Sequence, residues 1–285
     1  VQSVQQLYAP IMAQTAETIK TTTRLSLWIG CGITLFVLFI ILITCTSLVS
    51  FALKGEKDSL VAMTATTHPI QYYISLPTGW NKNKKWPVVV VSEAAEKEFR
   101  LNAERFAVAR GQMPFIIIAP VIVTNGNYGK RDPKVYPYTT DVWDQIDKDG
   151  ICSFDMTGLQ AVIKDVRQLY NGEEKFYITG FEAGAHLVWA MIFQHPEQLK
   201  AAVTVAGNYR SRCMENQNFS GDNSKNILPV KAMYGEKDSA FGKNGAIYSQ
   251  WLDAKKLAAQ HGYKNITEEE IKGKTHVPIP KEVLD

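Results

Sequence analysis

The sequence predicts a doubly wound α/β domain that follows a single membrane-spanning helix. Two observations carry this prediction. From residue 70 to residue 285, short β-branched runs alternate with amphipathic helical stretches, which is typical of a mostly parallel sheet covered by helices. Before that region lies one long apolar run. The chain of 285 residues carries a net charge of +3 without a basic block, so nucleic acid is not an expected partner.

The apolar run extends from Leu25 to Leu53 and contains no charged residue and no proline. As a helix it would be roughly 43 Å long, which exceeds the bilayer's hydrocarbon core of about 30 Å. We therefore expect an N-terminal arm at 1–24, a transmembrane helix at 25–53, a linker at 54–69 and one domain at 70–285. Basic residues flank both ends of the run equally, so the orientation stays open. We expect a single-pass membrane protein and favour an extracytoplasmic domain, because pairing of Cys152 with Cys213 would fit an oxidising compartment.

Apolar periodicity predicts the elements of the domain in order. Continuous or alternating apolar runs predict strands at 70–76, 86–91, 115–119, 175–179, 201–206 and 230–234. Helical spacing predicts helices at 98–110, 154–170, 185–194 and 245–261. The remaining long segment, 121–150, holds Tyr128, Tyr136, Tyr138 and Trp143. A loop of that length predicts a lid over a site or a docking surface, and we favour docking.

The segment Gly180-Phe-Glu-Ala-Gly184 joins a predicted strand to a predicted helix. It matches the G-x-S-x-G turn that presents a nucleophile, with Glu182 in the serine position. From Tyr72 to the C-terminus, the chain resembles the α/β-hydrolases, and among them the esterases related to feruloyl esterases and polyhydroxybutyrate depolymerases. The matching segments are Tyr73–Trp80, Tyr177–Ala185, His195–Leu199, Ala201–Gly207 and Pro229–Asp238.

The resemblance implies a triad at Glu182, Asp238 and His276. It also implies a His-Gly pair after the strand at 86–91, where this chain has Ser92 and Glu93. Loss of the serine removes covalent acyl catalysis, and a carboxylate in the oxyanion loop opposes the negative charge that develops there. We therefore expect an α/β-hydrolase fold with a degenerate, inactive site. It would hold no cofactor and no metal, and would act as a subunit or scaffold of a membrane complex.

Several alternatives stay open. Glu182 could serve a non-serine hydrolase, as an aspartate does in haloalkane dehalogenases and epoxide hydrolases, although glutamate is one methylene longer. The pocket could bind a small ligand, or Glu93, Glu182, Asp238 and His276 could hold a metal ion. For an inactive site, we expect Glu182 to form a buried ion pair with His276.

The expected partners are the lipid bilayer and other membrane subunits. They would be contacted through the transmembrane helix, the N-terminal arm and the loop at 121–150. Cys152 and Cys213 are the cysteines outside the apolar run, and sequence alone leaves their pairing open.

Overall fold

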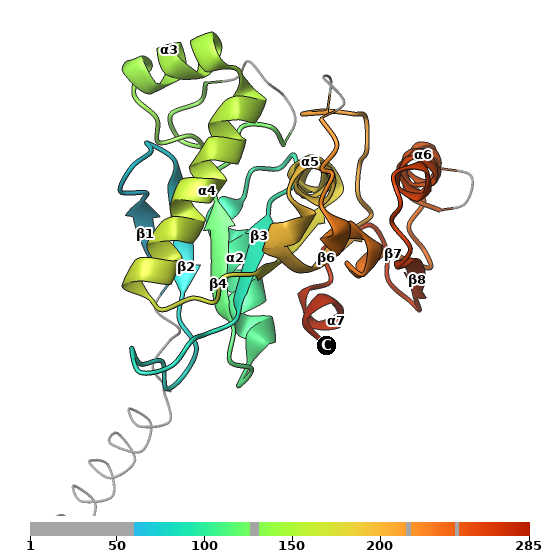
Figure 1. The fold of residues 1–285 in the computed structure, drawn as a ribbon, viewed down its shortest axis with the longest axis horizontal. Coiled ribbons are helices and arrows are strands. Elements are labelled where there is room, and N and C mark those ends of the chain that lie inside the picture. Colours follow the sequence, from blue (N-terminus) through green and yellow to red (C-terminus); the bar gives the residue numbers. More distant parts are fainter. Residues whose placement is uncertain (1–59, 126–130, 215–217, 243–244) are drawn as a thin grey trace, which may run out of the picture. The chain divides into compact units, whose positions relative to one another are not determined.

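An eight-stranded sheet forms the centre of the domain (Figure 1). The computed structural model describes residues 60–125, 131–214, 218–242 and 245–285. The strands are β1 (Val61–Thr64), β2 (Gln71–Ser75), β3 (Val88–Ser92), β4 (Ile116–Pro120), β5 (Phe176–Phe181), β6 (Leu199–Val205), β7 (Val230–Gly235) and β8 (Ile266–Ile271). Their order is β1-β2-β4-β3-β5-β6-β7-β8. Strand β2 is antiparallel to both of its neighbours, and the strands from β4 to β8 are parallel. The expected α/β-hydrolase fold is confirmed.

Helices cover both faces of the sheet. They are α2 (Phe99–Arg110), α3 (Thr140–Asp149), α4 (Ile151–Leu169), α5 (Ala185–Gln194), α6 (Ala246–Gln260) and α7 (Pro280–Leu284). Successive side chains of a strand point to opposite faces, and β3 shows this division. Val88 and Val90 belong to the core that includes residues of α4, α5 and α6. Val89 and Val91 pack with α2, and α7 closes the same side.

Two strands lie outside the predicted ranges. Strand β1 occupies part of the segment assigned to the linker, so the sheet begins before Ile70. Strand β8 has the sequence Ile-Thr-Glu-Glu-Glu-Ile and is mostly exposed, so it carries no apolar signal. It is an edge strand that pairs with β7 along its whole length. Backbone pairing, rather than burial, therefore defines it.

The predicted transmembrane helix at 25–53 and the arm at 1–24 lie outside the described residues. Within residues 60–285, apart from the three short undescribed segments, no helix is long and apolar enough to cross a membrane.

The segment predicted as a long loop is partly helical. Its C-terminal part forms α3, and the side chains of Tyr136, Tyr138 and Trp143 are buried. Tyr138 packs edge-on against Phe154 of α4 at a centroid distance of 5.4 Å. These aromatic residues therefore fill the core of the domain, whereas Tyr128 lies outside the described residues.

Cys152 and Cys213 form a disulfide, with their Cα atoms 5.2 Å apart. The bond links the first turn of α4 to the loop that follows β6. It settles the pairing that the sequence left open.

Candidate active site

The turn between β5 and α5 presents Glu182 at the carboxyl end of the sheet. Glu182 has a φ of 47°, in the left-handed region that non-glycine residues rarely adopt. A Cβ at Gly180 would lie 2.6 Å from the carbonyl oxygen of Gly184, and one at Gly184 would lie 2.5 Å from that of Ser92. The two glycines are therefore required, because the backbone closes tightly on itself and on the loop after β3. Strain of this kind is typical of a functional site.

The carboxylate of Glu182 reaches across to that loop. Its Oε2 accepts a hydrogen bond from the backbone N–H of Ala95 at 3.2 Å. The backbone carbonyl oxygen of Glu182 accepts a hydrogen bond from the N–H of Asn208 at 2.9 Å, which connects the turn to the loop after β6. Within the described part of the chain, no hydrogen bond occupies Oε1 of Glu182. One carboxylate oxygen is thus held and the other is available.

Asp238 and His276 form the acid–base half of the site. Asp238 is 2% exposed, and its Oδ2 lies 2.8 Å from Nδ1 of His276. Its Oδ1 accepts from the N–H groups of Ala240 and Phe241, both at 2.9 Å. Because an ionised carboxylate can only accept, Nδ1 carries the hydrogen and Nε2 of the neutral ring keeps its lone pair. The arrangement is that of a general base oriented by a buried carboxylate.

The loop that carries His276 is held close to the turn from Gly180 to Gly184 that presents Glu182, which we call the elbow. A Cβ at Gly235 would collide with the carbonyl oxygen of Lys274, so glycine permits this approach. The His276 ring packs on Phe181, the neighbour of Glu182, at a centroid distance of 5.0 Å. Its side chain is 34% exposed, so the imidazole is accessible from solvent.

The expected ion pair between Glu182 and His276 is not formed. Among the described residues, each side chain has a different partner, Ala95 for Glu182 and Asp238 for His276. Glutamate's additional methylene explains this, since it carries the carboxylate to the loop after β3.

Ser92 and Glu93 occupy the positions implied for the oxyanion loop. The side chains of both are buried, and the Glu93 side chain is 5% exposed. Burial raises the pKa of Glu93 to about 7, against smaller lowering effects of the Glu98 backbone and the Arg105 guanidinium of α2. Glu93 is therefore directed to the α2 side, and its negative charge is suppressed below pH 7. The loop offers the site the N–H of Ala95, a donor that side-chain identity does not reveal.

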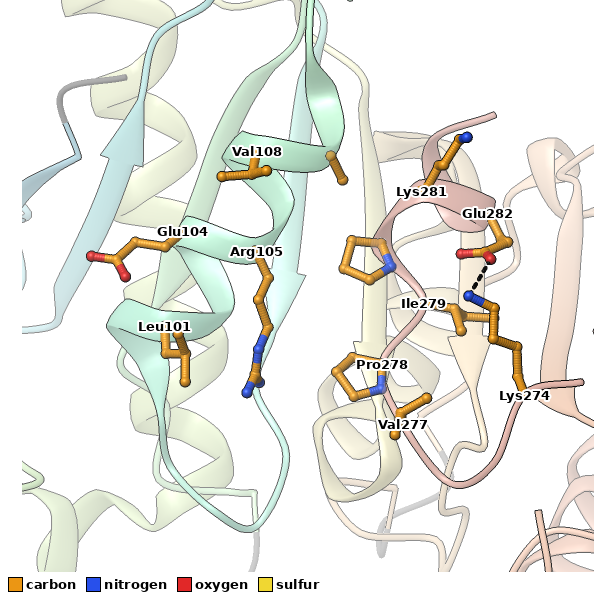
Figure 2. A pocket seen from close by; sticks show the side chains of 12 residues that line it. Leu101, Glu104, Arg105, Val108, Lys274, Val277, Pro278, Ile279, Lys281 and Glu282 are labelled. Carbon is orange, nitrogen blue, oxygen red and sulfur yellow. Dashed lines mark ion pairs between the residues drawn. The ribbon is translucent and has the colours of Figure 1, made fainter. Parts of the chain in front are cut away.

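A groove of about 700 Å³ lies next to the segment that follows His276 (Figure 2). Leu101, Arg105 and Val108 of α2 form one wall, and Val277 to Glu282 form the other. Neither Glu182 nor Asp238 lines this groove. In residues 60–285, outside the undescribed segments, no three His, Cys, Asp or Glu side chains gather as a metal site would require.

The elbow, the oriented histidine and the strand order define a protein of the α/β-hydrolase class. The sequence matches the model of the dienelactone hydrolase family over residues 71–266, and the chain belongs to this family. No curated protein matches the sequence.

Two solved structures share the fold. One is poly(aspartic acid) hydrolase-1 from Sphingomonas sp. KT-1, with 12% identity, a TM-score of 0.56, and coverage of 77% of this chain and 93% of that one. The other is a poly(3-hydroxybutyrate) depolymerase from Bordetella parapertussis, with 15% identity, a TM-score of 0.54, and coverage of 76% and 84%. At these identities the likeness shows the fold alone.

Family membership corrects the functional prediction. The family consists of hydrolases, so the interpretation of the chain as a pseudoenzyme and a non-catalytic membrane scaffold is wrong. The prediction was wrong because it assumed that a site without serine at position 182 could no longer catalyse hydrolysis. The Asp238–His276 pair is formed, and Glu182 still has a backbone N–H donor.

Proposed function

We propose that the protein is a hydrolase in which the Glu182 carboxylate is the nucleophile. The observation that carries this proposal is the hydrogen bond from the Ala95 N–H to Oε2 of Glu182. It leaves Oε1 free to attack and provides a donor at the oxygen that must later bear negative charge. The Asp238–His276 pair supplies the base for the second half of the reaction.

In the first step, Oε1 of Glu182 forms a bond to an electrophilic saturated carbon of the substrate. The bond from that carbon to its leaving group breaks, and the electron pair goes to the leaving group. A halide departs, whereas an epoxide oxygen stays on the substrate and takes a proton from solvent. The product of this step is an ester of Glu182. The step needs no oxyanion hole, which suits a site whose observed donor already contacts the nucleophile.

In the second step, Nε2 of His276 takes a proton from water, and the water oxygen attacks Cδ of Glu182. Negative charge then develops on Oε2, where the Ala95 N–H stabilises it. Collapse of this intermediate breaks the bond from Cδ to the ester oxygen, and the departing alkoxide takes its proton from His276. The released alcohol contains the original Oε1, and Glu182 keeps the water oxygen and releases its acid proton to solvent.

A carboxylate is a poor nucleophile toward simple alkyl esters, because it leaves a tetrahedral intermediate more readily than an alkoxide does. We therefore expect substrates with a halide or a strained ring oxygen on saturated carbon. The family match favours a second candidate, hydrolysis of an activated ester or lactone. In that reaction His276 would activate water directly, and Glu182 would not become esterified.

A single turnover in oxygen-18 water tests the covalent mechanism, and hydrolysis of an activated lactone without turnover of a chloroalkane or epoxide would favour the second candidate. With enzyme in excess over a chloroalkane or epoxide, the first alcohol formed should contain unlabelled oxygen, and the peptide containing Glu182 should gain the label. His276→Gln should accumulate the Glu182 ester, because water is no longer activated. Solvent label in the first product, together with an unlabelled Glu182 peptide, would refute the covalent mechanism.

The anchoring of the domain is a second part of the proposal. Leu25–Leu53 would span the membrane once, and the domain would lie in an extracytoplasmic, oxidising compartment. The Cys152–Cys213 disulfide supports that compartment, since such bonds persist mainly outside the cytosol. Alkaline carbonate extraction should leave the full-length protein in the membrane fraction. External protease should digest the domain in cells from which outer barriers have been removed, and protection of the domain would reverse the orientation.

A further inference from the structure

A buried asparagine lies behind the peptide that contacts Glu182. Asn125 follows β4 and is 0% exposed. Its Nδ2 donates to the carbonyl oxygen of Ala94 at 2.8 Å. That carbonyl and the N–H of Ala95 belong to the same planar peptide, and the N–H donates to Glu182. Asn125 therefore binds the carbonyl oxygen of this peptide, and Glu182 binds its N–H.

The orientation of the Asn125 amide is fixed by a second contact. Its Oδ1 accepts from the phenolic hydroxyl of Tyr136 at 3.3 Å. Since the hydroxyl donates to the oxygen, the NH₂ group is directed to Ala94. Tyr136 is itself buried, with its ring 5.9 Å from that of Phe99. The amide is thus held by packed groups on both sides.

The backbone before Asn125 is equally constrained. Asp155 of α4 is fully buried, and its carboxylate accepts from the N–H groups of Val123 and Thr124 at 2.7–3.0 Å. These bonds hold the segment after β4 against α4 and place the next residue, Asn125, beside the loop after β3. The position of Asn125 is therefore set by the core and does not depend on a ligand.

The geometry points to Asn125 as a positioning residue that aims and polarises the Ala95 N–H at Oε2 of Glu182. This role rests on the proposed covalent mechanism. A hydrogen bond to the carbonyl of a peptide draws electron density toward the oxygen, which makes the N–H of that peptide a stronger donor. The chain of bonds runs from Tyr136 through Asn125 and the Ala94–Ala95 peptide to Glu182.

This role predicts an effect on one step only. The Ala95 N–H faces negative charge that develops on Oε2 during hydrolysis of the Glu182 ester. Formation of that ester instead removes charge from the carboxylate. Loss of Asn125 should therefore slow decay of the ester more than its formation, and the ester should accumulate. A direct oxyanion donor contributes roughly 100-fold to 1000-fold in rate, so a residue acting through it should contribute less, about 10-fold to 100-fold.

The test uses the full-length protein in mild detergent with a chloroalkane or epoxide that the parent turns over. Formation and decay of the ester on the Glu182 peptide are followed by quenched mass spectrometry. Asn125→Ala should slow decay by about 10-fold to 100-fold, with ester formation changed by less than about 3-fold. Asn125→Leu keeps a similar side-chain volume, loses the donor to Ala94 and introduces no buried charge, so it should have the same effect. It replaces the alanine variant if that variant fails to fold.

Two tyrosines provide a matched control pair. Tyr136→Phe removes the hydroxyl that holds the Asn125 amide and should slow decay to a smaller extent. Tyr138→Phe removes a buried hydroxyl from the same aromatic cluster, one that donates to the Val121 carbonyl instead. It should leave the ratio of decay to formation at the parental value.

The outcomes are distinct. A parent protein that never forms the Glu182 ester overturns the proposed function, and the role of Asn125 with it. A parent that forms the ester, with Asn125 variants that decay at the parental rate, overturns the role of Asn125 alone. Equal slowing of both steps, accompanied by a lower Tm, would assign Asn125 to stability and also overturn the inference.

Discussion

Replacing Gly184 by alanine should separate the elbow from the loop after β3, whose Ala95 N–H donates to Glu182. The added Cβ would lie 2.5 Å from the Ser92 carbonyl oxygen and 2.6 Å from that of Glu93. Carbon–oxygen contacts begin at about 3.3 Å, so the loop after β3 must retreat by about 0.8 Å. The contact from Ala95 to Glu182 is already 3.2 Å long, and such a shift would break it.

The cost of Gly184→Ala should appear in both stability and activity. Overpacking of this kind typically costs about 1–3 kcal/mol. The backbone of Gly184 has a φ of −60°, so alanine introduces no conformational strain and the effect is steric. Loss of the Ala95 donor should slow decay of the Glu182 ester by roughly 100-fold or more.

Urea denaturation and quenched single-turnover kinetics measure the two effects separately. Gly221→Ala is the control, because among the described residues no atom outside its two chain neighbours lies within 4 Å of the Cβ position at Gly221. It should change neither quantity. A Gly184→Ala variant that keeps the parental decay rate would show that the contact between elbow and loop has no part in the reaction.

Three further predictions concern the rest of the domain. Glu93 has a folded-state pKa of about 7, above its ordinary 4.5, so its contribution to stability is complete below pH 4.5 and is lost as the pH rises through 7. The free energy of unfolding of Glu93→Gln relative to the parent should therefore rise between pH 5 and pH 8, by at most about 3 kcal/mol in urea titrations. Parallel pH profiles of the two proteins would contradict this. Replacing Cys152 and Cys213 by serine should cost about 2–5 kcal/mol, with a lower Tm in the absence of reductant; an unchanged Tm would mean that the bond does not form. A fragment of residues 58–285 should be folded by circular dichroism, because it forms one compact unit, and an unfolded fragment would place part of its core in the preceding residues.

Much of the fold could be predicted because burial leaves a pattern in the sequence. The helix α5 spans the predicted residues 185–194, and β3 and β4 are continuous apolar runs. Strand β8 could not be predicted in this way. Its exposed glutamates are held by contacts distant in sequence, such as the ion pair of Glu269 with Lys231 and the bond from the Trp251 indole to Glu268.

The sequence predicted the side chains of the site but not the backbone groups that contact them. Asp238 and His276 were implied by the resemblance to the esterases, and the structure pairs them. The donor to Glu182 is a backbone N–H of an alanine, which has no signature in the sequence. Asn125 is one asparagine in a loop, and only the contacts of the segment after β4 with α4 reveal where its amide lies. The functional prediction failed because it judged the oxyanion loop by Ser92 and Glu93.

Glu182 stands on the elbow after β5, whereas Asp238 and His276 stand on loops after β7 and β8. No hydrogen bond joins the two halves in the described part of the chain. Under the proposed mechanism, a change of residue 182 would alter the attacking atom and leave the geometry of the Asp238–His276 pair unchanged. A single substitution at position 182 could change which bond such a protein cleaves, while His276 remains available as the base. On such a scaffold, the residue at position 182 can be exchanged without disturbing the pair that would activate water.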